Sequence, residues 1–598
     1  MSPHAQRTSG WTSLASAAAL ITAVTLASRM VGFGRWLAQA QFVGTGGIDA
    51  PYNSANILPN LLFEVAAGGA LAGAVVPLVS GPLSRAASGL QSSIQAKAQA
   101  SLSASALLTW TMAILLPLGG LTAVFAQPIA SALDLGDPAL TATAALFLRV
   151  FSLQIPVYGI AVVLGGILQA HKRFFWPTFA PLVSSLVVIA VYASFGALAQ
   201  GQQGNVSTLS QAAIDFLAWG TTLGVAFLAL PLLAPVRSTG LRLRPSFRFP
   251  PGEGQRAASL AFAGIAALIA QQVSTFIIMR TANSVGGPGV WTVYLYIQQI
   301  YLLPYAVLAF PIATSAFPHF TAHSAAGRYN QLRALVQSTT RLLLLTTALG
   351  AAALMAAAPH IERVFSAIAT GDGVAGLGTG LTFMAPGLLG LALILHASRI
   401  LMATDHARSA MVATAAGWTL TSALVLALPL LDNFRSTSAG QLSRVTIMGY
   451  LGASVTLGMW CAGLLLLLAV HRHLGPGALT GLPRTCGILA VGLGLGAVLG
   501  RLISLPGLPG ANGTAGAGTT DSGLPPVLPP SVPLPSVPLP PGQLSTGQML
   551  VQALAWGALA ALTAGLVVAA VALADGQLRQ RLRRASKALA RRVSRSGH

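Results

Sequence analysis

Long apolar runs recur along the whole chain and predict its architecture. A helix that crosses the hydrocarbon core of a membrane needs about 20 mostly apolar residues. By that measure the sequence predicts fourteen membrane-spanning helices, so that both termini lie on the same side. Their approximate ranges are 13–43, 55–80, 100–126, 140–170, 174–199, 212–235, 257–283, 289–318, 334–358, 376–403, 408–431, 446–470, 482–504 and 548–574.

Basic residues fall in alternate connections between these runs. The positive-inside rule places such connections on the cytoplasmic side. They share that side with Arg7 and the C-terminal tail, so a plasma-membrane protein with both termini in the cytoplasm is expected. The basic connections contain Arg85 and Lys97; Lys172 and Arg173; five arginines between 237 and 256; Arg328 and Arg333; Arg408; and Arg472 and Arg484.

Composition supports the membrane class. Only 8% of the 598 residues are charged, against roughly 25% in soluble proteins, and mean hydropathy is +0.72. The net charge of +21 is explained by the positive-inside pattern, so no nucleic-acid partner is expected. Cys461 and Cys486 both lie in apolar runs, which favours buried hydrophobes over a disulfide or a metal site.

The arginine-rich connection divides the first twelve spans into two halves. We expect an N-terminal lobe of six helices over 1–236, a cytoplasmic linker over 237–256 and a C-terminal lobe of six helices over 257–473. Leu58-Pro59 in the second span and Leu303-Pro304 in the eighth form a loose internal repeat. Two lobes around a central cavity, related as parallel repeats, are therefore predicted for this all-α membrane protein.

Two further helices follow the lobes within 474–575. The loop between them includes a Pro-rich segment, 507–543, which predicts an extended extracytoplasmic spacer. The tail, 576–598, carries eight basic residues and no acid. This tail fits either a helix on the anionic inner leaflet or a solvated positive-inside segment.

No sequence pattern indicates catalysis. Metal-ligand clusters, nucleophile–base constellations and phosphate-binding loops do not stand out, and the Gly-rich stretch 371–380 lacks the P-loop lysine. We therefore expect neither an enzyme nor a cofactor, and a transport cavity is the leading use of the polar residues.

Polar and ionisable side chains are concentrated around the first two spans. Such groups cost several kcal/mol at membrane depth unless they face a partner or a wet cavity. Residues 53, 56, 60 and 64 follow the 3-4-4 spacing of one helical face. The expected lining residues are Arg29, Arg35, Asp49, Asn53, Asn60 and Glu64, joined by Arg280 and Gln299 from the seventh and eighth spans.

Arginines in both lobes indicate an anionic ligand, since guanidinium groups suit phosphates. Arg29 and Arg35 are expected about 120° apart around the helix and about 9 Å apart along it. Both can therefore line the same chamber only if that chamber is wide. A structural alternative is that Arg35 pairs with Glu64 or Asp49 between helices. Arg280 can likewise extend to the membrane surface rather than into the cavity.

The first eighty residues carry motifs that resemble the MurJ/MviN family, the lipid II flippases of bacterial peptidoglycan synthesis. The resemblance extends over nearly all the chain except the Pro-rich loop and the basic tail. The motifs are Ser28-Arg29, Gly32-Phe33-Gly34-Arg35, Asp49-Ala50, Leu58-Pro59-Asn60-Leu61, Gly68-Gly69-Ala70 and Val76-Pro77-Leu78.

This resemblance implies the fold of the multidrug/oligosaccharidyl-lipid/polysaccharide exporters and alternating access. The implied substrate is undecaprenyl-linked disaccharide-pentapeptide, moved from the inner to the outer leaflet. By the same resemblance Arg29 and Arg35 meet its diphosphate, and Asp49 matches the acidic residue at the start of the second helix. Two departures are Phe63-Glu64 and Gln299, where many members have arginine. Arg280 is our candidate replacement.

Alternative functions stay open at the level of sequence. One is a cation-coupled drug exporter or another polysaccharide-lipid flippase of the same fold. A second is a non-transporting scaffold that recruits cell-wall enzymes through its tail. For a flippase, the sequence leaves open whether membrane potential or a coupled cation drives transport.

Overall fold

The structure is a computed structural model that describes residues 3–65, 72–88, 92–255, 265–371, 373–430, 443–503 and 546–574. Within these ranges the regular structure is helical, and the β-type pairing found there is the isolated bridge between Thr45 and Gly371. The Gly68-Gly69-Ala70 motif, the Pro-rich loop and the basic tail lie outside the described residues.

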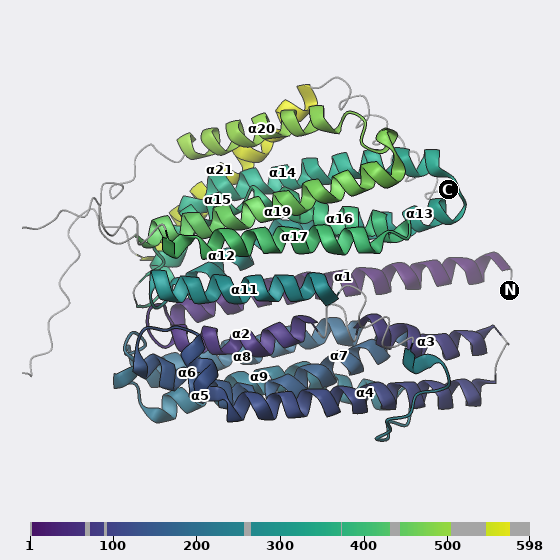
Figure 1. Cartoon of the computed structure of the whole chain (residues 1–598), viewed down its shortest axis with the longest axis horizontal. Helices are drawn as coiled ribbons and strands as arrows, with labels where there is room; N and C mark the ends of the chain where they lie inside the picture. Colours follow the sequence, from purple (N-terminus) through teal and green to yellow (C-terminus); the bar gives the residue numbers. More distant parts are fainter. Residues whose placement is uncertain are drawn as a thin grey trace, which may run out of the picture.

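The first part of the chain forms one group of helices, seen in purple and blue in the lower part of Figure 1. Within it, α1 lies along the boundary with the second group. The helices are α1 (Pro3–Phe42), α2 (Asp49–Val65), α3 (Ala72–Ala87), α4 (Ser93–Val124), α5 (Ala126–Ala132), α6 (Pro138–Phe151), α7 (Gln154–Ala170), α8 (Phe175–Ala199), the 3-10 turn η2 (Val206–Thr208) and α9 (Gln211–Arg237).

The second part forms the upper, teal-to-yellow group in Figure 1, where α11 faces the first group. Its last helices, α20 and α21, pack on α14 through an apolar cluster that includes Ala348, Leu489 and Ala564. The helices are α11 (Ile265–Gly286), α12 (Val290–Pro304), the π-helical η3 (Tyr305–Ala309), α13 (Phe310–Ala325), α14 (Tyr329–Ile368), α15 (Leu377–Met384), α16 (Gly387–Ala403), α17 (Ala407–Leu426), α19 (Arg444–Leu474), the 3-10 turn η4 (Pro476–Ala478), α20 (Leu482–Ile503) and α21 (Thr546–Ala574).

The predicted all-α membrane architecture is confirmed. Among the described residues, ten helices are long and apolar enough to cross a membrane, and the pair α15–α16, bent by 46°, makes an eleventh. The other three predicted ranges coincide with α1, with α2 plus α3, and with α11. Fourteen spans are consistent with this arrangement, and the exact count stays a prediction.

The arginine-rich connection after α9 lies along α4 as an extended strap. Its backbone amides at Arg242, Arg244 and Ser246 donate to the hydroxyls of Ser101, Ser105 and Thr109, at 3.2, 3.0 and 2.9 Å. Those hydroxyls are spaced four residues apart, on one face of α4. The segment that the sequence predicts as a linker is therefore bound to the first group of helices over these residues.

Glycines allow neighbouring helices to approach closely, as is common in membrane bundles. Gly390 of α16 lies against the backbone of α19, where an added Cβ would come 2.8 Å from the amide nitrogen of Trp460. Gly463 of α19 lies at the same contact, because a Cβ added there would be 3.3 Å from the Cα of Gly390. This contact fixes the distance between the two helices.

Substituting Gly390→Val tests this packing. Forcing a branched side chain into a closely packed contact costs about 1–3 kcal/mol, so the apparent melting temperature of the detergent-solubilised protein is expected to fall by several degrees. The matched control is Gly565→Val in α21, because a Cβ there has no neighbour within 4 Å. Equal melting temperatures for the two variants would contradict the close contact.

Candidate functional site

A cavity of about 430 Å³ lies between the two groups of helices. Its walls come from α1, α2, α7, α8 and α9 on one side and from α11 and α12 on the other. Amide and hydroxyl groups dominate its polar lining: Gln39, Tyr52, Asn53, Asn56, Asn60, Tyr158, Ser184, Ser185, Tyr192, Thr221, Gln271, Gln272, Thr275, Gln298 and Gln299. This surface offers many hydrogen bonds to a polar ligand.

Arg35 carries the positive charge of this cavity among the described lining residues. It is half-buried on α1, with its guanidinium carbon 5.4 Å from the centre of the Trp36 ring. Arg29, on the same helix, is exposed and is not among the lining residues. The structure thus places Arg35 among the lining residues of this cavity and leaves Arg29 outside them.

Glu64 also lines the cavity and bridges its two walls. Its Oε2 accepts a hydrogen bond from Nε2 of Gln272 at 2.6 Å, which joins α2 to α11. Among the described residues, no ion pair joins Arg35 to Glu64 or to Asp49, the alternative considered from the sequence. The Arg35 guanidinium therefore remains available to an anionic ligand.

The three asparagines of α2 differ in burial and in hydrogen bonding. Asn53 is buried, accepting from Gln39 at 2.8 Å and donating to Thr292 of α12 at 2.9 Å. Asn60 is exposed to the cavity and accepts from the hydroxyl of Tyr158 at 3.2 Å. The side-chain oxygen of Asn56 is buried without a hydrogen-bond partner in the described part of the chain.

Asp49 and Arg280 lie outside the cavity lining. Asp49 is fully buried at the first turn of α2, where it accepts from the amide of Gly47 at 2.8 Å and its negative charge suits the helix dipole. Arg280 is exposed and pairs with Asp134 at 3.4 Å. Gln299, in contrast, lines the cavity as predicted.

Contacts between the two groups of helices close one end of the cavity. The amide of Thr45, after α1, donates to the carbonyl of Thr370, after α14, at 2.9 Å. Asn283 of α11 donates to Ser54 and to the carbonyl of Leu133, at 3.1 and 3.0 Å. We call these contacts, with the Asn53–Thr292 bond, the polar seal.

A glycine makes the polar seal possible. Gly289 has a φ of +86°, in the left-handed region that favours glycine, and a Cβ there would be 2.6 Å from the amide nitrogen of Gly46. The two backbones can therefore touch at this point only without a side chain.

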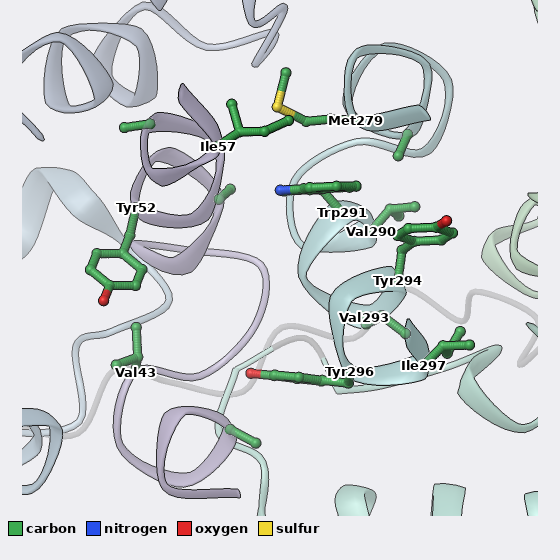
Figure 2. Packing of buried hydrophobic residues seen from close by; sticks show 14 of the residues in the cluster. Val43, Tyr52, Ile57, Met279, Val290, Trp291, Val293, Tyr294, Tyr296 and Ile297 are labelled. Carbon is green, nitrogen blue, oxygen red and sulfur yellow. The ribbon is translucent and has the colours of Figure 1, made fainter. Parts of the chain in front are cut away.

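Aromatic side chains fill the space beside the seal. Figure 2 shows Tyr52 and Ile57 on α2 and the row from Val290 to Ile297 on α12, with Met279 of α11 pointing toward Ile57. The indole nitrogen of Trp291 points toward α2 in this view and has no hydrogen-bond partner among the described residues. Trp291 also lines the cavity, so this donor is held at its wall.

Several wall residues were not predicted from the sequence. Tyr52 hydrogen-bonds Tyr192 of α8 and Thr221 of α9, at 2.9 and 3.1 Å, forming one side of the cavity. Tyr158 comes from α7. Only the packing of the helices shows that these hydroxyls meet, because they come from spans that are far apart in the sequence.

Comparison with known structures shows which solved proteins share this fold. A solved structure titled "Lipid II flippase MurJ, inward closed conformation" aligns with a TM-score of 0.63 and 16% identity, covering 93% of this chain and 99% of that one. An inward-facing multidrug resistance MATE family transporter of the MOP superfamily aligns with a TM-score of 0.55 and 14% identity, covering 76% and 98%. The chain thus shares its fold with both of these solved proteins.

The sequence comparisons give the family. A profile of the family described as lipid II flippase MurJ matches residues 39–451, which is more than half of the chain, so the chain belongs to the MurJ family. A probable lipid II flippase MurJ from Rhizobium meliloti (strain 1021) is 26% identical over 355 residues. That match covers 59% of this chain and 63% of the relative, just under two thirds of its length.

Weakening the polar seal is expected to separate the two groups of helices at that end. Thr292→Val leaves the Asn53 amide without its acceptor, at a cost of about 1–3 kcal/mol. The open population should therefore rise by about fivefold or more. The measurement is the distance between spin labels at Ser207 and Ala375, made by pulsed electron paramagnetic resonance in a background without Cys461 and Cys486. A larger open population should add a longer distance to the distribution.

The control for this experiment is Thr347→Val. Thr347 is equally buried, but its hydroxyl donates to the carbonyls of its own helix. The Thr347→Val variant should therefore leave the distance distribution unchanged. An identical distribution for Thr292→Val and the parent protein would show that this bond does not hold the end closed.

Proposed function

We propose that this chain moves a lipid-linked peptidoglycan precursor, lipid II, from the inner to the outer leaflet of the bacterial plasma membrane. Membership of the MurJ family supports the substrate class. The observation that carries the proposal is the cavity between two groups of helices, with an arginine free of carboxylate partners among the described residues and a wall of amides. Transport is the use that we propose for this arrangement.

Arg35 is proposed to hold the diphosphate of the substrate. A guanidinium offers paired donors that match phosphate oxygens. The hydrogen bonds between the two groups are strongest where water is excluded. Arg29 lies about two turns closer to the N-terminus, within electrostatic range of Tyr305, and is proposed to attract the diphosphate on its approach. The side-chain amides of Asn60, Gln298 and Gln299, which line the cavity, suit the sugars and the peptide.

Alternating access is proposed to use the lobes expected from the sequence, 1–236 and 257–473. Both termini are assigned to the cytoplasm by the positive-inside pattern, which places the polar seal at the outer end. In this proposal the polar seal opens at the outer end, and the two lobes close at the opposite end, near the Glu64–Gln272 contact. The cavity is then exposed to the outer leaflet. The strap over residues 242–246 is proposed to move with the first lobe, because its backbone is bound to α4.

A second candidate is a cation-coupled exporter of organic cations. The structural similarity to a MATE family transporter and the presence of Glu64 in the cavity wall favour it. In such an exporter the carboxylate binds the cation, whereas in the proposed flippase the guanidinium binds the anion. The two functions therefore depend on different side chains of the same cavity.

Complementation of a bacterium depleted of its lipid II flippase tests the proposal. Wild type should restore lipid II exposure at the outer face. Arg35→Ala should lower it about tenfold or more, since a charge-assisted hydrogen bond contributes about 1.5–3 kcal/mol. The Arg35→Lys variant should give lipid II exposure between that of wild type and that of Arg35→Ala. The control is Arg237→Ala, which removes an exposed arginine at the end of α9, outside the cavity, and should behave as wild type.

Glu64→Gln separates the two candidates. It removes the charge but keeps an oxygen that can accept from Gln272, so a flippase should retain most of its activity. An exporter of organic cations should lose efflux of a fluorescent cation with this variant. Full rescue by Arg35→Ala together with failure of Glu64→Gln would overturn the flippase mechanism.

The scaffold alternative is tested by deleting 576–598 from the same chain. A flippase should keep most lipid II exposure without the tail. Loss of cell-wall synthesis with intact lipid II exposure would instead support recruitment of cell-wall proteins.

A further inference from the structure

A second cavity, of about 370 Å³, lies between α17 and α19 and shares no lining residue with the central cavity. We call it the inner groove. Its walls are apolar, formed by Val412, Ala413, Leu465, Leu468 and Ala469. Its mouth is polar and basic, formed by Arg408, Ser409, Arg472 and His473.

The inner groove lies beside a point where the two helices cross closely. A Cβ on Gly417 of α17 would be 2.6 Å from the carbonyl oxygen of Gly458 on α19. From this crossing α17 runs back to its first residue, Ala407, while α19 runs on to its last, Leu474. The groove thus extends along both helices toward the end where the arginines lie.

Arg408 occupies a position that the helix itself disfavours. It lies in the first turn of α17, where the helix dipole is positive and the N-cap residue, His406, makes no side-chain capping bond. Among the described residues no carboxylate forms an ion pair with Arg408 or Arg472. An anion held between these two exposed guanidinium groups would compensate both charges and the free end of α17.

The mouth is also organised by two histidines. Nε2 of His473 lies 3.3 Å from the hydroxyl of Ser409, and the rings of His406 and His473 have centroids 3.6 Å apart. These contacts join the start of α17 to the end of α19. They hold the arginine-bearing turns at a defined separation above the apolar walls.

We propose that the inner groove binds one anionic phospholipid of the cytoplasmic leaflet. The phosphate lies between Arg408 and Arg472, and an acyl chain follows the apolar walls. A lipid rather than a free phosphate is the occupant because the walls below the charges are exposed to the hydrocarbon, Val412 by 57% and Leu468 by 43%. Basic pockets between membrane helices on this side suit anionic headgroups.

The test uses the full-length purified chain in detergent, with lipid binding followed by native mass spectrometry. Phosphatidylglycerol and phosphatidylcholine of identical acyl chains are compared at equal concentrations. Wild type should retain phosphatidylglycerol in clear preference. Arg408→Ala combined with Arg472→Ala should weaken that binding about tenfold or more, since each arginine near the surface contributes about a fivefold effect.

Matched variants identify the groove as the site. Arg237→Ala combined with Arg328→Ala removes two exposed arginines from the same end of the bundle and should not change the preference. Ala469→Trp fills the groove without altering charge and should reduce binding as strongly as the double arginine variant. Monodisperse gel filtration confirms that each variant is folded.

Three outcomes would overturn the proposal. The first is equal loss with the control pair, which would indicate general attraction to basic residues. The second is unchanged binding with Ala469→Trp, which would place the lipid elsewhere. The third is displacement of the lipid by inorganic phosphate at equal concentration, which would mean that the site recognises the phosphate alone. None depends on which substrate the central cavity carries.

Discussion

The cost of a polar group within the membrane is the constraint on which this structure depends. An unpaired amide or charge in hydrocarbon costs several kcal/mol, so each must find a partner or face a wet cavity. Asn53 takes the first course, bonding Gln39 on its own side and Thr292 across the interface. Asn60 takes the second, at the cavity wall. A single helix, α2, thereby both closes the cavity and lines it.

Features that depend on local periodicity could be predicted from the sequence. The 3-4-4 spacing of residues 53, 56, 60 and 64 places them on one face of a helix, and all four line the cavity. The helix ranges follow in the same way from runs of apolar residues, because a membrane span must be about 20 residues long. Both inferences need only the geometry of one helix.

Features that depend on how helices are rotated against one another could not be predicted. Arg29 and Arg35 are on the same helix and differ by about 120° around its axis, so the packing of α1 decides which one faces the cavity. Arg280 has Asp134 as its partner, a residue from the other group of helices. The hydroxyls of Tyr52, Tyr192 and Thr221 meet only after three helices have assembled.

The two carboxylates of α2 show why position decides what a charge can do. Asp49 stabilises the start of the helix and bonds its own turn, so it adds little to the cavity. Glu64 lies near the other end and is held by an amide, Gln272, instead of by Arg35. A direct ion pair would have neutralised the guanidinium. Because Glu64 bonds an amide across the interface, Arg35 keeps a guanidinium without an ion-pair partner among the described residues.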